Sequence, residues 1–115
     1  MSITETATID IVAARPDSSI VKLVITDHLT WDDLETHTRL LQEKINTYLD
    51  FIESGQLHRL QAPKIPVTPI VHIILAVQHP PSSEAELFLS QVLDFLASVD
   101  VHFEVEHRPE RNSSF

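Results

Sequence analysis

The 115-residue chain has no cysteine and a single glycine, Gly55. The absence of cysteine excludes disulfides, thiolate metal sites and thiol nucleophiles. One glycine leaves almost no scope for a loop that cradles phosphate through its backbone amides. No apolar run approaches the roughly 18 residues of a membrane span, and the first ten residues do not resemble a signal peptide. We therefore expect one cytoplasmic domain over residues 1–115, with flexible tails at 1–7 and 109–115.

Basic residues are also scarce. Eight Lys and Arg stand against 17 Asp and Glu, which gives a formal net charge of −9. Nucleic acid and anionic membranes require clustered positive charge, so neither is expected as a partner. An acidic surface suits a basic protein instead.

A long helix is the clearest feature of the sequence, and it lies between Asp27 and Gly55. Thr30 fits an N-cap, with Asp33 three residues later in the position of a capping box. Gly55 stands where a left-handed residue would end the helix. Apolar residues at a spacing near 3.6 predict its buried face: Leu34, Leu41, Ile45, Tyr48, Leu49 and Ile52.

Four strands and a second helix are predicted around it. The strands are 8–14, 19–26, 70–77 and 101–107, and the first two form a hairpin across a Pro-containing turn. Ser83 and Glu86 predict the start of the second helix. Its predicted apolar stripe is Leu87, Phe88, Val92, Phe95, Leu96 and Val99. Residues 70–107 then form a right-handed parallel β-α-β unit. The expected fold class is α+β, a two-layer sandwich in the order β-β-α-β-α-β, whose four-stranded mixed sheet carries both helices on one face.

The segment from Asp27 to Gly55 resembles the signature of a small uncharacterised bacterial family, a domain of unknown function. The shared pattern is DHLxWDD followed by LQEKINxYLxFIESG. The resemblance covers about a third of the chain and is weaker in the proline-rich segment 62–69. It implies a bacterial source and an α/β fold, and it transfers no role to any residue.

A polar cluster at the start of the long helix is the first candidate site: Asp27, His28, Asp32, Asp33 and His37. Carboxylates and imidazoles so close in sequence could bind a divalent metal or form a general base. The alternative is that the acids satisfy the helix dipole while His37 pairs with Asp33 one turn away. This second interpretation is favoured. Trp31 could stack on a ligand, although its spacing to Leu34 favours a place in the core.

The last strand carries a second polar set, His102, Glu104 and Glu106, with His72 expected opposite on the neighbouring strand. Such residues could ligate metal or bind a cation, but the alternation of the strand also predicts a solvated sheet face.

These observations favour a non-enzymatic, protein-binding module that forms a homodimer, without metal, cofactor or catalytic residues. Two dimer surfaces are predicted. The first is the sheet face without helices, built from Val12, Ile20, Val24, Ile70 or Val71, and Ile74 or Leu75, with a rim of Asp10, Lys22, His102 and Glu104. The second is the end of the long helix near Tyr48, Phe51 and Ile52. The alternative function is a small-molecule or metal-binding protein, or a minor hydrolase, that uses the cluster Asp27, His28, Trp31, Asp33 and His37.

Overall fold

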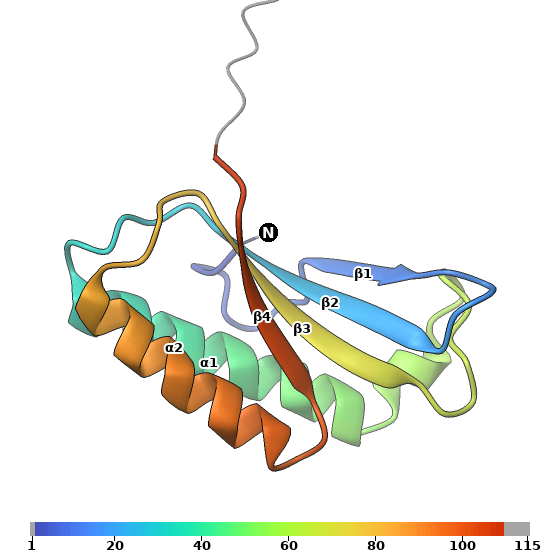
Figure 1. Ribbon diagram of the computed structural model, residues 1–115. Helices are drawn as coiled ribbons and strands as arrows, with labels where there is room; N and C mark the ends of the chain where they lie inside the picture. Colours follow the sequence, from blue (N-terminus) through green and yellow to red (C-terminus); the bar gives the residue numbers. More distant parts are fainter. Residues whose placement is uncertain (1, 110–115) are drawn as a thin grey trace, which may run out of the picture.

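Four strands and two helices follow the predicted order in the computed structural model, which describes residues 2–109 (Figure 1). The strands are β1 (Ile11–Ala14), β2 (Ile20–Asp27), β3 (Ile70–Val77) and β4 (His102–His107). The helices are α1 (Leu34–Glu53) and α2 (Ser83–Ala97), and a short 3-10 helix, η1 (Gln56–Arg59), follows α1. The predicted fold class is confirmed.

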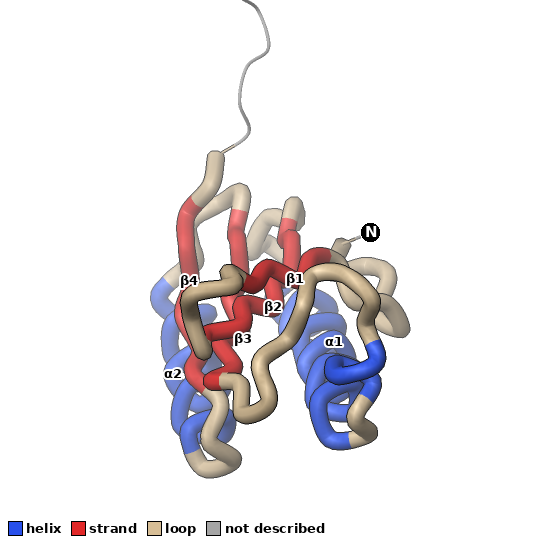
Figure 2. The backbone as a smooth tube through the Cα atoms, turned by 90° about the vertical axis from the view of Figure 1, so that its right-hand side faces the viewer, coloured by secondary structure: helices blue, strands red, loops and turns tan. Residues whose placement is uncertain are grey.

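The sheet is mixed, with the strand order β1-β2-β3-β4. β1 pairs with β2 in antiparallel orientation, while β2, β3 and β4 run parallel. α1 connects β2 to β3, and α2 connects β3 to β4, so there are two β-α-β units in succession. Figure 2 shows both helices on one side of the sheet, and none of the helices in residues 2–109 lies on the other side. Because β2, β3 and β4 are parallel, their carboxyl ends all lie at the same end of the sheet.

The main core lies between the sheet and the helices. Val21, Leu23 and Ile25 of β2 face it, as predicted. In α2 the buried stripe is Ala85, Leu89, Val92 and Leu96. The predicted stripe was therefore partly wrong, because Leu87 is 70% exposed and Phe95 is 52% exposed. Periodicity alone fails here, since α2 has apolar residues on most of its circumference.

The helix-free face has a small apolar centre of its own, made by Val24, Ile74 and Ala76. Val12, Val71 and Leu75, which were predicted as possible members of this face, pack against the main core instead. The register explains the difference for Val12: it pairs with Leu23, whose side chain points toward the helices.

The N-cap of α1 lies three residues later than predicted, and the N-cap of α2 lies one residue earlier. Asp33, not Thr30, is the N-cap of α1, and its carboxylate accepts a hydrogen bond from the N–H of Thr36. Ser82, not Ser83, is the N-cap of α2, with its hydroxyl oxygen accepting from the N–H of Ala85. At the end of α1, Gly55 has φ of 82°, which confirms the predicted left-handed residue.

The N-terminal segment, residues 2–10, differs from the expected flexible tail. Ile3 is fully buried, and its N–H donates to the carbonyl oxygen of Thr26 at 2.9 Å. This segment therefore packs along β2 beyond the end of β1. Residues 110–115 of the other predicted tail lie outside the described residues. Of the helices within residues 2–109, none is both long and apolar enough to cross a membrane.

Candidate functional site

Asp27, Trp31 and His37 come together where β2 ends and the chain turns toward α1. Asp27 is the last residue of β2, and His37 lies in the first turns of α1. His37 Nε2 lies 2.5 Å from Asp27 Oδ2. The indole of Trp31 stacks on the His37 ring, with 3.7 Å between ring centroids and 12° between planes. Three of the five predicted site residues therefore form one cluster.

The hydrogen bonds of this cluster define where its protons lie. His37 Nδ1 is 2.9 Å from the carbonyl oxygen of Thr30, and a carbonyl only accepts, so Nδ1 carries a proton. His37 Nε2 faces the carboxyl group of Asp27. Asp27 Oδ1 accepts from the N–H of Leu29 at 3.1 Å, and Trp31 Nε1 donates to the carbonyl oxygen of His79. Both ring nitrogens of His37 and both carboxyl oxygens of Asp27 therefore have hydrogen-bond partners within the protein.

The pair is also closed to solvent, since the side chains of His37 and Asp27 are 1% and 0% exposed. A general base must reach the proton that it abstracts, and this imidazole reaches only Asp27 and Thr30. The arrangement therefore ties the start of α1 to the end of β2, and the predicted pairing of His37 with Asp33 was wrong.

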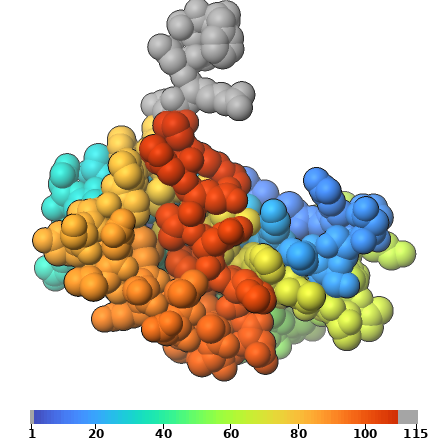
Figure 3. All heavy atoms as spheres, viewed as in Figure 1, coloured from blue at the N-terminus to red at the C-terminus, as the bar shows by residue number. Residues whose placement is uncertain are grey.

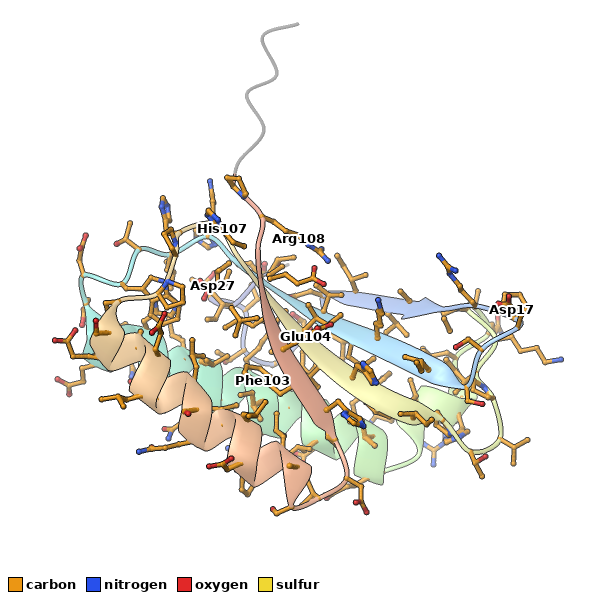
Figure 4. The ribbon with its side chains drawn as sticks, viewed as in Figure 1. Asp17, Asp27, Phe103, Glu104, His107 and Arg108 are labelled. Carbon is orange, nitrogen blue, oxygen red and sulfur yellow. The ribbon has the colours of Figure 1, made fainter. Side chains whose placement is uncertain are left out.

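The other two predicted site residues lie apart from this cluster. Asp33 is exposed at the N-terminus of α1, and its hydrogen bonds with Thr36 lower the pKa of its carboxyl group. His28 is exposed in the loop after β2. His28 borders a shallow hollow of about 330 Å³ at the carboxyl ends of the strands, whose lining also includes Thr26, Gln78 and Arg108. Figure 4 shows Asp27, His107 and Arg108 at this end of the sheet.

A second buried polar cluster, which the sequence analysis did not identify, surrounds Lys44 of α1. Its ammonium group donates to the carbonyl oxygens of Glu5 and Thr8 and to Asp10 Oδ1, each at 2.7 Å. Lys44 and Asp10 are completely or almost completely buried. The predicted position of Asp10 on the rim of the helix-free face was wrong, because its carboxylate pairs with Lys44 of α1. The spacing did indicate that Lys44 lies on the buried face of α1, because Lys44 follows Leu41 by three residues and precedes Tyr48 by four.

Tyr48 belongs to the same cluster. Its hydroxyl group donates to the carbonyl oxygen of Val24 at 2.7 Å and accepts from the N–H of Asp10 at 3.0 Å. Burial raises the pKa of this phenol well above its usual value. Tyr48 is therefore a core residue, and the predicted dimer surface at the end of α1 loses its largest member.

On the helix-free face, His72 of β3 and His102 of β4 are neighbours, as predicted. Their ring centroids are 4.6 Å apart with 38° between planes. Burial, and then the charge of His102, lower the pKa of His72. Within residues 2–109, no group of three or more metal-ligating side chains is arranged to hold a metal ion.

Residues 1–109 match the sequence profile of one protein family, DUF6572, which is described as a family of unknown function. The chain belongs to the DUF6572 family. This membership confirms the predicted resemblance to an uncharacterised family. No curated protein and no solved structure matches the chain.

Several large apolar side chains of this DUF6572 chain are exposed on α2 and just after it. Leu87, Leu93, Phe95 and the following Val99 are each more than two-fifths exposed. A groove of about 450 Å³ separates α2 from α1, and its lining includes Ile45 and Phe88. A second hollow, of about 350 Å³, lies between α2 and β4, where Leu93 and Ala97 face Val101 and Phe103. In Figure 3 the atoms of α2 and β4 lie together at the front of the molecule.

Proposed function

We propose that this chain is a non-enzymatic, protein-binding module of the bacterial cytoplasm that works as a symmetric dimer. The observation that carries the proposal is the exposure of apolar side chains on α2, with Leu93 at 45% and Phe95 at 52% exposed. Exposed apolar patches on soluble domains mark surfaces that contact other proteins. A two-fold contact is the commonest closed arrangement for identical chains.

The polar clusters support a binding role over a catalytic one. The Asp27–His37 pair is closed to solvent, and so is the Lys44–Asp10 pair. Both pairs join elements of the fold, which accounts for their chemistry without a substrate. The remaining surface is acidic, with a net charge of −9, and would attract a basic protein as a further partner.

Exposure favours α2 over the two dimer surfaces predicted from the sequence. Val24 and Ile74, at the centre of the helix-free face, are only 5% and 1% exposed within a single chain. Association there would remove little apolar area from water, and apolar area is the main source of binding free energy. Phe51 and Ile52 at the end of α1 are already partly packed on the core.

Light scattering coupled to size-exclusion chromatography tests the proposal directly. At a concentration of about 20 μM, where a contact of ordinary size is populated, the wild-type chain should have twice its monomer mass of 13.0 kDa. A single species of monomer mass at this concentration would contradict self-association.

A small-molecule site is the second candidate, favoured by the hollow beside His28 and Arg108. Ligands of open α/β sheets bind outside the carboxyl ends of the strands, which is where this hollow lies. Arg108 pairs with Glu106, so a bound anion would compete with that ion pair. Calorimetric titration with inorganic phosphate, and separately with Zn²⁺, should give heat above buffer if this candidate is correct. The absence of heat in both titrations would contradict the small-molecule site and leave the protein-binding module as the proposed function.

A further inference from the structure

We propose that the dimer forms through the free edge of β4, which pairs in antiparallel orientation with β4 of a second copy. The two sheets would then form one continuous eight-stranded sheet with a two-fold axis at Phe103. This inference rests on the self-association proposed above and specifies its surface and register.

The edge of β4 is equipped for this pairing. β4 is the last strand of the sheet formed by residues 2–109, so within this range one of its sides has no neighbouring strand. The N–H of Arg108 donates to Val77 on β3, and peptide groups alternate their direction along a strand. The N–H and C=O groups of Phe103 and Val105 therefore point away from β3, toward the free edge. An edge of this kind is a template for another strand. Figure 2 shows β4 at the border of the sheet with α2 beneath it.

The faces of the sheet restrict the possible registers. A two-fold axis perpendicular to the sheet keeps the helices of both copies on one side, so paired residues must point to the same face. With the axis at Phe103, this residue lies opposite the partner's Phe103 on the helix side. Val105, which is 37% exposed, lies opposite the partner's Val101 on that side. His102 lies opposite the partner's Glu104 on the helix-free side, where the imidazole N–H can donate a hydrogen bond to the carboxylate.

Neighbouring registers are less favourable. An axis at Glu104 places this carboxylate against the partner's Glu104. An axis at Val105 places Glu104 against the partner's Glu106. Like charges directly opposite each other destabilise a strand pair. Within the bounds of β4, the Phe103 register avoids both contacts and places His102 opposite the partner's Glu104. The strand thus complements itself, which is why the occupant is a second copy of the same chain.

The helix side of the edge offers a matching surface. The hollow between α2 and β4 is lined by Leu93 and Ala97 from α2, by Val101 just before β4, and by Phe103 from β4. Figure 4 shows Phe103 on the α2 side of β4. A crossover helix lies over its two strands, so α2 and the partner's α2 would be about two strand spacings apart, roughly 10 Å. This is the distance at which helices pack, and Leu93 would meet the partner's α2.

A pair of leucine variants tests the position of the interface. Leu93→Glu introduces charge into the proposed contact, and Leu87→Glu introduces the same charge about 120° away around α2. Both leucines are exposed, at 45% and 70%, so neither change should unfold the monomer. Light scattering at about 20 μM should show a monomer for Leu93→Glu and a dimer for Leu87→Glu.

A pair of valine variants tests whether strand pairing is involved. Val105→Pro removes an N–H that points to the free edge, and proline is tolerated on edge strands. Val105→Thr keeps that N–H and serves as its control. We expect a folded monomer for Val105→Pro by circular dichroism and light scattering, and a dimer for Val105→Thr.

A charge exchange tests the register. His102→Glu places two carboxylates opposite each other at both ends of the contact, which should weaken dimerisation about tenfold. Glu104→Lys should weaken it as well, because the partner's His102 loses its carboxylate acceptor. The double variant places Glu opposite Lys and should restore the wild-type dissociation constant to within about threefold.

The outcomes separate this inference from the proposed function. A wild-type dimer that persists in both Leu93→Glu and Val105→Pro would overturn the β4 interface and leave self-association intact. A dimer that is lost in these variants but not restored by the charge exchange would overturn the Phe103 register. A monomeric wild type would overturn self-association itself.

Discussion

Lys44 and Asp10 form an ion pair that has almost no contact with water, and it joins α1 to the N-terminal segment. The three donors of the ammonium group all find oxygen acceptors at 2.7 Å. A buried charge is costly unless it is paired and hydrogen-bonded, so the cluster is complete only when all its members are present.

Lys44→Met should destabilise the protein by about 3–5 kcal/mol, because Asp10 is left as an uncompensated buried charge. Urea unfolding followed by circular dichroism measures the loss. Adding Asp10→Asn to Lys44→Met should recover part of it, since the orphan charge is then removed. A loss below about 1 kcal/mol for Lys44→Met would show that Asp10 reaches water in solution.

Gly55 permits a prediction about backbone conformation alone. Its φ is 82°, and a Cβ added there would meet nothing within 4 Å. Gly55→Val should therefore cost about 1–2 kcal/mol of unfolding free energy through the left-handed conformation itself. Gly55→Asn, which tolerates this region, should cost clearly less in the same denaturation experiment. Equal losses in the two variants would point to a side-chain clash instead.

Residue partners were the least predictable part of the molecule. Asp33 and His37 are four residues apart and would share a helix face, which predicted their pairing. The structure starts the helix at Leu34, so Asp33 is committed to capping, and His37 meets Asp27 from the end of β2. Such a contact depends on how the β2–α1 loop folds, and no local spacing rule encodes it.

At the scale of elements, the two helix starts differ from prediction by three residues and by one residue, so a different residue caps each helix. In the sequence Pro80–Glu84 two adjacent serines compete for the cap of α2, and both precede acidic residues. The structure selects Ser82, which leaves Ser83 in the first turn of the helix.

The two serines provide a matched test of this assignment. Ser82→Ala should destabilise the protein by about 1 kcal/mol, because the N–H of Ala85 loses its acceptor. Ser83→Ala should be close to neutral, since alanine is a good helix former. Thermal unfolding of both variants decides between the two caps. The reverse order of stabilities would restore the predicted start at Ser83.

The order and type of the elements were predictable for a physical reason. Each strand and helix of this chain has its own period of apolar residues, and parallel strands joined by a helix have a fixed handedness. The helix-bearing face of β2 followed directly from the alternation of Val21, Leu23 and Ile25. The apolar side of α2 did not, because its surplus apolar residues, Leu87 and Phe95 among them, blur the period.

At the scale of the whole molecule, charge controls behaviour in solution. The formal net charge is −9 at pH 7, and protonation of all seven histidines would bring it to −2. Molecules with little net charge repel one another weakly and precipitate more easily.

Solubility should therefore fall as the pH decreases from 7.5 to the sequence pI of about 5.0. Histidine titrates near pH 6.5, so the fall should begin above the range in which carboxylates titrate. His72 should contribute late, because its pKa is lowered. Precipitation by polyethylene glycol measures the effect across this range. Solubility that stays constant down to pH 5.5 would contradict the role of the histidines.

The N-terminal segment has a practical consequence for producing the protein. A boundary chosen from sequence would start the domain near Thr8, where the first strand was predicted. That choice would remove Ile3 from the core and the Glu5 carbonyl oxygen from Lys44. A shortened chain would thus carry a buried ammonium group with a missing acceptor, and the expected result is poor yield of folded material. Affinity tags at this end need a spacer, because the folded unit begins within the first three residues.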